Sequence, residues 1–304
     1  MHSAEHHLDA FVSRVWEHYD AHARDALPWR LTRDPYRVLV SEVMLQQTQV
    51  SRVVPKYAEF LRAFPDVETL ATAPLEDVLR VWAGLGYNRR AKSLKRIAEI
   101  VVAEHGGAIP DTLNGLVALP GIGYATAAQI LAFAFDVGVP FIETNIRSVY
   151  LHEFFGDAED VPDSAILPLV EATLDRGRPR EWYWALMDYG VYLKATLANP
   201  SRRSRHHVTQ GPFEGSNRQL RGRLLAALAG AVGAADDGSD ASRAPASDDA
   251  RDDGRCGRRS NAIGKTAADL AHEVRFERER VDAALSGLQS EGFVVCEEGR
   301  WRIG

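Results

Sequence analysis

The amino-acid sequence predicts an all-α protein that ends in a small α+β segment. From residue 1 to about residue 225, apolar side chains recur at i, i+3 and i+4 in one segment after another, which is the spacing of amphipathic helices. No strand-like alternation has comparable strength in this region, and prolines separate the helical segments. After residue 260, two further helical segments precede a short alternating stretch, which predicts a hairpin.

Composition narrows the class of protein. The chain has 304 residues, a formal net charge of −6 and 45% hydrophobic residues, which is typical of a soluble protein with one large or two moderate domains. No apolar run approaches the roughly 18 residues of a membrane helix, and the N-terminus lacks the features of a signal peptide. We therefore expect a monomeric cytoplasmic protein, associated with the nucleoid in a prokaryote, that does not contact membranes.

The helical periodicity predicts a series of helices in the first 200 residues. They are expected at residues 8–22, 35–50, 54–64, 74–85, 90–105, 123–135, 165–177 and 180–193. A shorter helix is expected over 111–120, and another begins at Thr144. These segments account for the all-α character of this region.

An acidic stretch divides the C-terminal part. Residues 231–260 hold seven Asp and five Arg with almost no large apolar side chain, so burial cannot offset the entropy of ordering them. We expect a disordered linker there, and consequently a domain over 1–215 and a second domain over 216–304.

The elements around this linker resemble a winged helix-turn-helix. Helices are expected over 217–230, 265–274 and 277–292, and a hairpin turns near Glu298 and Gly299. The linker would then be an insertion between the first and second helices of a winged-helix-like α+β domain.

A glycine-rich turn, "LPGIG", joins two predicted helices. Gly121 and Gly123 flank Ile122 and permit backbone conformations with positive φ and a close approach. The helix from Tyr124 opens with unpaired N–H groups, and its dipole favours a phosphate oxygen. The turn could therefore bind phosphate groups of the DNA backbone without base-specific contacts. A plain connection between two helices explains the same residues.

Two glutamates lie in contrasting predicted settings. Glu42 follows Val38 and Leu39 along an apolar helix stripe, which disfavours its charged form, as a general acid requires. A structural Glu paired with an Arg remains an alternative. Glu143 directly precedes the helix from Thr144, where backbone donors favour its ionised form. Two carboxyl groups separated in pKa suit glycosidic cleavage, although an ordinary capping role is equally compatible with Glu143.

Two further segments suit contact with DNA. The polar run "QQTQ" at 46–49 is poor core material and could wedge into a duplex, although a solvated helix end explains it as well. In "GLGYNRRAKSLKR", Tyr87 stands on a glycine turn, where it could stack on bases. Five cationic residues that could meet phosphates follow it: Arg89, Arg90, Lys92, Lys95 and Arg96.

Several of these segments stand in a definite order. They are "LPWR", "SEVMLQQTQV", "GLGY" and "LPGIG", with "ETN" further on. In this order they resemble the helix-hairpin-helix base-excision DNA glycosylases, most closely the MutY-type adenine glycosylases, over residues of about 10–193. The resemblance implies a fold of two α-helical subdomains with the base pocket in the cleft between them.

The resemblance also implies residue roles at the reacting centre. Glu42 matches the acid that protonates the adenine leaving group, and Glu143 matches the carboxylate that stabilises the oxocarbenium-like sugar. Asn145 matches the Asn of the same motif.

Further roles concern the base pocket and the DNA. Trp29 and Arg30 match residues near the extruded base, and Asp188 is assigned to the same pocket. The implied DNA-binding residues are Gln46, Gln47, Tyr87, Arg89, Arg90, Gly121, Ile122, Gly123, Tyr124 and Thr126.

The sequence departs from the family pattern at four points. The family carboxylate is usually Asp, and Glu143 shifts it by roughly 1.5 Å. Ala125 stands where bifunctional relatives carry a Lys, so a Schiff-base lyase step is not expected. Lys194 stands where the first cysteine of an iron–sulfur cluster would be, and no other cluster cysteine follows it. The winged-helix-like segment replaces the family's C-terminal domain that reads an oxidised guanine.

These observations predict a monofunctional adenine DNA glycosylase without a cluster. No metal site or other cofactor is expected, and a monovalent cation at the hairpin is compatible with the sequence. The expected partner is double-stranded DNA with a mispaired or damaged base. A thymine or uracil mismatch glycosylase and a non-catalytic DNA-binding protein are the alternatives.

Overall fold

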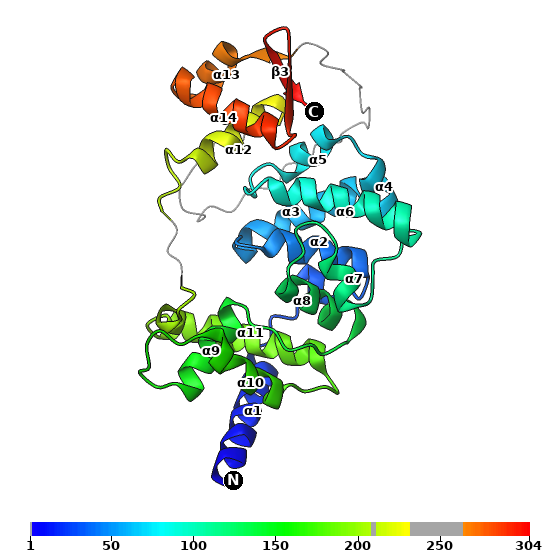
Figure 1. The fold of residues 1–304 in the computed structure, drawn as a ribbon. Coiled ribbons are helices and arrows are strands. Elements are labelled where there is room, and N and C mark those ends of the chain that lie inside the picture. Colours follow the sequence, from blue (N-terminus) through cyan, green and yellow to red (C-terminus); the bar gives the residue numbers. More distant parts are fainter. Residues whose placement is uncertain (1, 208–210, 232–263) are drawn as a thin grey trace, which may run out of the picture. The chain divides into compact units, whose positions relative to one another are not determined.

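A computed structural model describes residues 2–207, 211–231 and 264–304. The chain forms two compact units (Figure 1). The first unit comprises Met1–Ala73 and Lys92–Gly211, and the second comprises Pro74–Ala91 and Pro212–Gly304. The predicted all-α architecture with a small C-terminal sheet is confirmed.

The first unit is helical. Its helices are α1 (His2–His22), α2 (Pro35–Leu45), α3 (Val50–Ala63), α4 (Val67–Thr72), α7 (Leu113–Val117), α8 (Tyr124–Phe135), α9 (Thr144–Phe154), α10 (Asp163–Thr173) and α11 (Pro179–Thr196). Two short 3₁₀ turns, η1 (Pro28–Arg30) and η2 (Pro200–Arg203), accompany them. Helix α6 (Arg89–His105) is shared between the units: its first residues, up to Ala91, belong to the second unit, and the rest belongs to the first.

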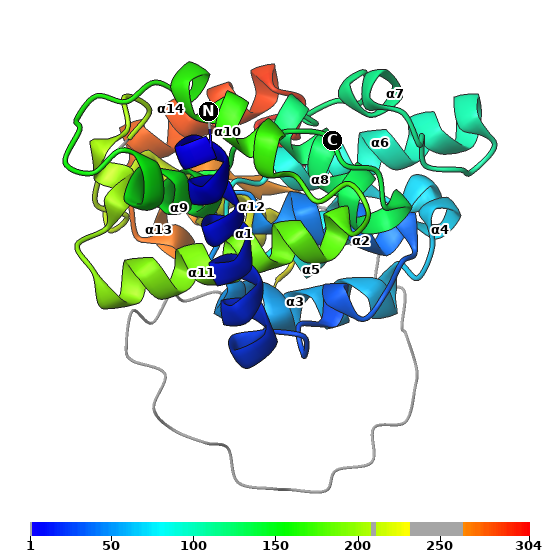
Figure 2. The same ribbon diagram turned by 90° about the horizontal axis from the view of Figure 1, so that it is seen from below.

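An aromatic core holds helices α1, α9 and α11 of the first unit together. The N-terminal helix α1 packs against α11, and α11 packs against α9 (Figure 2). Phe11 of α1 lies 5.2 Å from Tyr150 of α9 and 6.2 Å from Trp182 of α11, measured between ring centroids. These three side chains are fully buried, and burying such large rings contributes strongly to stability. The core therefore fixes α9 and α11, which carry several predicted site residues.

The helix predicted over 35–50 is shorter in the structure, and the helix predicted over 54–64 begins earlier. Asp34 caps α2 by accepting hydrogen bonds from the next backbone N–H groups, but the helix ends at Leu45. Gln47 adopts a left-handed conformation with φ 53°, which breaks the helix before α3 starts at Val50. Pro55 lies inside α3, so its interpretation as a separator was wrong.

The second unit combines helices with a small sheet. Its elements are α5 (Leu75–Trp82), α12 (Asn217–Leu228), β1 (Lys265–Thr266), α13 (Ala267–Val274), α14 (Arg278–Ser290), β2 (Val294–Glu297) and β3 (Arg300–Ile303). The strands form an antiparallel sheet in the order β1-β3-β2, and α12 packs against α13 and α14. The predicted hairpin is confirmed, with positive φ at Glu298 and Gly299. Lys265 and Thr266 form a strand where a helix start was predicted.

The second unit also includes Pro74–Ala91, which the sequence-based division assigns to the domain of residues 1–215. Helix α5 packs on α12, and Arg80 donates a hydrogen bond to the carbonyl of Ala229 at 2.7 Å. The functional division at residue 215 stays a prediction. Apart from its first residue, the linker predicted over 231–260 lies outside the described residues. Within the described ranges, no helix is long and apolar enough to cross a membrane.

Candidate active site

Glu42 is a buried carboxyl group on α2. Its neighbours along the helix, Val38, Leu39 and Val43, are buried as well, because the apolar stripe of α2 faces the interior. The pKa of Glu42 is raised to about 8, because burial and the negative charge of Glu143 raise it by more than the positive charge of Arg30 lowers it. The side chain can therefore hold a proton at neutral pH.

Glu143 caps the N-terminus of α9, as predicted. Its Oε1 accepts hydrogen bonds from the backbone N–H of Asn145 at 2.8 Å and of Ile146 at 2.9 Å. Its Oε2 accepts a third from the Asn145 side-chain amide at 3.2 Å. These bonds hold the carboxylate in one orientation, close enough to influence the pKa of Glu42.

Arg30 and Asp188 form a buried ion pair. The Arg30 guanidinium donates to both carboxylate oxygens of Asp188, at 2.7 and 2.8 Å. Arg24 donates to the same carboxylate from its backbone N at 3.1 Å and from Nε at 2.5 Å. Burial alone would raise the pKa of Asp188, but the hydrogen bonds and charge of Arg30, with those of Arg24, lower it. Asp188 thus fixes the side chain of Arg30.

An aromatic ring packs against this ion pair, and a second aromatic side chain lies next to it in the sequence. The Arg30 guanidinium lies 5.1 Å from the ring centroid of Trp184. Trp29, next to Arg30 in η1, is buried and lies edge-on to Tyr57 at 5.7 Å. Arg30, Asp188 and Trp184 therefore form one packed cluster, and Trp29 adjoins it as the chain neighbour of Arg30. Arg24 and Trp184 are additional members that the sequence reasoning missed.

The helix–hairpin–helix element connects α7 to α8. Gly121 has φ 81°, a conformation that side chains rarely adopt, and Ile122 is buried. Gly123 is the N-cap of α8 and has no side chain to occupy the first N–H groups. Tyr124 is exposed at the start of α8, so an anion could approach the backbone there.

The predicted wedge residues lie at the break after α2. The Gln46 side-chain amide donates a hydrogen bond to Thr126 Oγ1 on α8 at 3.2 Å. Gln47 is exposed and left-handed. The first turn of α8 and the polar run after α2 are therefore in direct contact.

Tyr87 belongs to the second unit. It has φ 47° and follows Gly84 and Gly86, which also have positive φ. Its hydroxyl accepts a hydrogen bond from Arg218 of α12 at 2.9 Å.

The two arginines after Tyr87 contact protein groups. Arg90 is buried, donates to the carbonyls of Leu85 and Gly86, and lies 5.5 Å from the Tyr87 ring centroid. Arg89 forms an ion pair with Glu291 at 2.9 Å. Their predicted contact with DNA stays a prediction, and their observed contacts hold the glycine turn.

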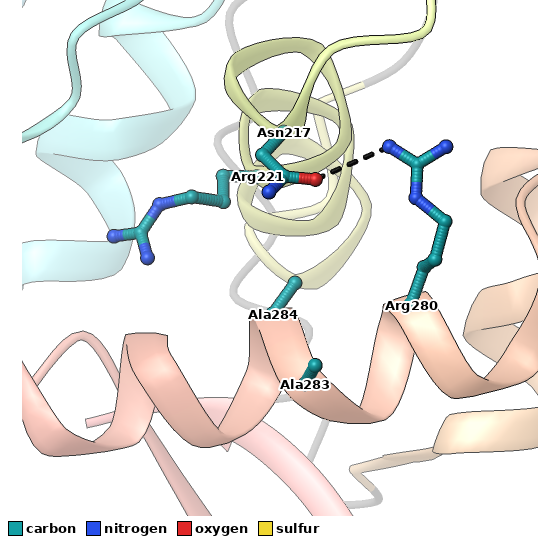
Figure 3. A pocket seen from close by; sticks show the side chains of 5 residues that line it. All are labelled: Asn217, Arg221, Arg280, Ala283 and Ala284. Carbon is teal, nitrogen blue, oxygen red and sulfur yellow. Dashed lines mark hydrogen bonds between the residues drawn. The ribbon is translucent and has the colours of Figure 1, made fainter.

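A pocket of about 330 Å³ lies in the second unit (Figure 3). Arg221 and Arg280 flank a floor made by Ala283 and Ala284 of α14, and Arg280 donates a hydrogen bond to Asn217 at 3.1 Å. None of the predicted site residues lines this pocket.

The iron–sulfur cluster that the resemblance implies does not fit this chain. Such clusters are held by four cysteine thiolates, and the whole sequence contains two cysteines, Cys256 and Cys296. Cys296 lies in β2, and Cys256 is outside the described residues. Among the described residues, no group of three or more His, Cys, Asp and Glu side chains could hold a metal ion.

The fold and the site together define a class of protein: a helix–hairpin–helix protein with a buried carboxyl group, Glu42, whose pKa is influenced by the charge of a second carboxyl group, Glu143, fixed at a helix start. The chain belongs to the HhH-GPD superfamily of base excision DNA repair proteins, whose family model matches residues 40–197.

Named relatives agree with this family. The chain is 37% identical over 187 residues to an adenine DNA glycosylase from Buchnera aphidicola, covering 60% of this chain and 52% of the relative. It is 35% identical over 237 residues to an adenine DNA glycosylase from Mycobacterium tuberculosis, covering 69% of this chain and 75% of that protein. The chain thus spans about half the length of the Buchnera relative and three quarters of the mycobacterial one.

A solved structure shares the fold. The structure of a thermostable thymine-DNA glycosylase superimposes with a TM-score of 0.57 and 26% sequence identity. The match covers 64% of this chain and 90% of that protein.

Proposed function

We propose that this chain is a monofunctional DNA N-glycosylase of base excision repair that removes adenine mispaired with guanine or 8-oxoguanine. One observation carries the proposal: a buried carboxyl group with a pKa of about 8, Glu42, is influenced by the charge of a carboxylate fixed at a helix start, Glu143. The two adenine DNA glycosylases named above support the choice of base.

The reaction follows from the two carboxyl groups. The target nucleotide is extruded from the duplex, at a cost of a few kcal/mol in lost stacking and pairing. Glu42 donates its proton to a ring nitrogen of adenine while the glycosidic bond breaks and its electron pair leaves with the base. The Glu143 carboxylate stabilises the positive charge that develops on the sugar. A water molecule then adds to the sugar carbon and releases a proton.

The DNA would be a duplex with a mispaired or damaged base. Phosphate contact at the start of α8 is supported by the open N-cap at Gly123 and by the exposure of Tyr124. Gln46 and Gln47 lie next to this phosphate-binding position, because Gln46 donates a hydrogen bond to Thr126 in the first turn of α8. Asp188, Arg30 and Trp29 would line the base pocket.

Removal of thymine is the second candidate, because a thymine-DNA glycosylase shares the fold. The proton held by Glu42 favours a purine, since a purine offers a ring nitrogen that can accept a proton as the bond breaks.

The test measures single-turnover excision from duplexes that carry single A·G, A·8-oxoguanine, T·G or U·G pairs. We expect the wild-type protein to excise adenine, and Glu42→Gln to lose roughly 10²- to 10⁴-fold in rate, the range for a general acid. Excision confined to T·G or U·G would favour the pyrimidine reading. No excision by the wild-type protein from any duplex, with binding retained, would indicate a non-catalytic DNA-binding protein.

Glu143→Gln serves as a second variant. Its amide oxygen can still accept the backbone hydrogen bonds at the start of α9, so we expect little loss of stability. The negative charge is removed, and we expect a fall of about 10²- to 10³-fold in the excision rate, as for other electrostatic stabilisers. A Glu143→Gln protein as active as wild type would remove Glu143 from the mechanism.

A further inference from the structure

Lys194 contacts the site from α11. Its Nζ donates a hydrogen bond to the side-chain oxygen of Asn145 at 2.9 Å, although the two residues are 49 positions apart. The side chain is half-buried, and burial lowers the pKa of Lys194, while the charge of Glu143 opposes that effect. The Lys194 side chain is therefore held in place by this hydrogen bond and is partly shielded from water.

The hydrogen bonds run in one direction from Lys194 to Glu143. Lysine can only donate, so it must face the amide oxygen of Asn145. The Asn145 NH₂ group then points to Glu143 Oε2 at 3.2 Å, while Oε1 is bonded to the two backbone N–H groups. The Asn145 side-chain amide has nearly the same shape when it is rotated by 180°. The hydrogen bond from Lys194 to its oxygen therefore selects the orientation in which its NH₂ group donates to Glu143.

The packing of α11 on α9 brings the lysine into place. A Cβ atom added at Gly190 would lie 2.5 Å from the carbonyl oxygen of Asn145, so the two helices touch at their backbones there. Lys194 is one helical turn beyond Gly190 and projects from the same side of α11. The close approach lets the lysine side chain reach the start of α9.

We propose that Lys194 is a positioning residue, which orients Asn145 and thereby fixes the Glu143 carboxylate for the glycosylase reaction. The inference rests on the proposed function. Glutamate has one more methylene than aspartate, so the Glu143 carboxylate has more freedom to move than a shorter side chain would have. The Lys194–Asn145 chain supplies an extra anchor to that longer side chain.

Three variants test this role in the full-length chain. Lys194→Met keeps the side-chain length but cannot donate, and we expect its single-turnover excision rate to fall about 10- to 100-fold. Lys194→Arg can donate to the same oxygen and should recover most of the rate. Lys56→Met is the control, because Lys56 is also partly buried and pairs with Glu59 at 2.8 Å on α3. It should excise at the wild-type rate.

A double-mutant cycle separates positioning from support of the fold. In an Asn145→Ala background, Lys194→Met should lower the rate by no more than about twofold, since both changes break one chain of contacts. Affinity for mispaired DNA should change by less than about threefold in Lys194→Met, because the residue acts on Glu143 and not on the duplex. Independent, multiplicative losses would overturn the inference, as would a wild-type rate in Lys194→Met.

A spectroscopic measurement keeps this test apart from that of the proposed function. The ¹⁵N side-chain amide signal of Asn145, identified by its loss in Asn145→Ala, should shift in Lys194→Met and stay unchanged in Lys56→Met. An unchanged signal would show that the contact does not form and would overturn the inference by itself. If the signal shifts in Lys194→Met but the wild-type protein excises no base, the contact exists. Both the proposed function and the positioning role are then overturned.

Discussion

At the residue scale, the proton on Glu42 would make the proposed reaction depend on pH. Burial and the charge of Glu143 raise its pKa to about 8. The rate of adenine excision should be constant from pH 6 to about pH 8, and then fall tenfold for each further pH unit, as the acid form is lost. The measurement is the single-turnover rate at saturating enzyme between about pH 6 and 9.5. A rate that rises through this range would exclude Glu42 as the general acid.

The same group should affect the free energy of unfolding with a defined sign. The pKa of Glu42 in the folded state is above its ordinary value of 4.5, so the folded state keeps a proton that the unfolded chain releases. Stability should therefore decrease as pH rises from about 4.5 to about 8, by at most about 1.4 kcal/mol per pH unit. Glu42→Gln should lack this contribution, and denaturant titrations of both proteins across that range measure the difference.

At the scale of elements, the contact between α9 and α11 depends on one glycine. Gly190→Ala would place a methyl group 2.5 Å from the Asn145 carbonyl oxygen, so the helices would have to separate. We expect a loss of about 1–3 kcal/mol in stability, the usual range for overpacking, and a lower excision rate, because Asn145 and Glu143 lie at that contact.

Gly222 in α12 is the matched control for this change. A Cβ atom there meets no atom within 4 Å, and Gly222→Ala should stabilise the protein by up to about 1 kcal/mol through helix propensity. Chemical denaturation of the two variants beside the wild type provides the comparison. Equal effects of the two substitutions would contradict the close approach of α11 to α9.

At the scale of the whole molecule, the stability of the chain should not depend on iron. Two cysteines cannot supply the four thiolates of a cluster, and large aromatic side chains such as Trp182 and Tyr183 fill the core beside α9 and α11. The purified protein should show no visible absorbance, and strong chelators should leave its melting temperature unchanged. A colour that chelators bleach together with a loss of stability would contradict this.

Local patterns predicted much of the fold and part of the site. Glu42 could be placed on a buried stripe because its apolar neighbours are three and four residues away. Glu143 could be placed at a helix start because that signal lies within three residues. The break at Gln47 was missed, because nothing in the polar run 46–49 requires the left-handed backbone that ends the helix there.

Contacts between distant residues had no such signal. Arg24 and Asp188 are 164 positions apart, and Lys194 meets Asn145 across 49 positions. Only the packing of α1, α9 and α11 brings these pairs together, and no spacing in one sequence encodes it. For the same reason the packing of α5 on α12 could not be predicted, because α12 follows α5 at a long distance in the sequence.

The attachment of Tyr87 to α12 has a practical meaning for anyone who shortens this protein. A clone that stops before α12 would delete Arg218, which bonds the tyrosine hydroxyl, together with the Ala229 carbonyl that receives Arg80 and the Glu291 carboxylate that receives Arg89. The segment from α5 to the start of α6 would then lose three of its contacts at once. Measurements on such a fragment would include the effect of these lost contacts and should not be assigned to the longer chain.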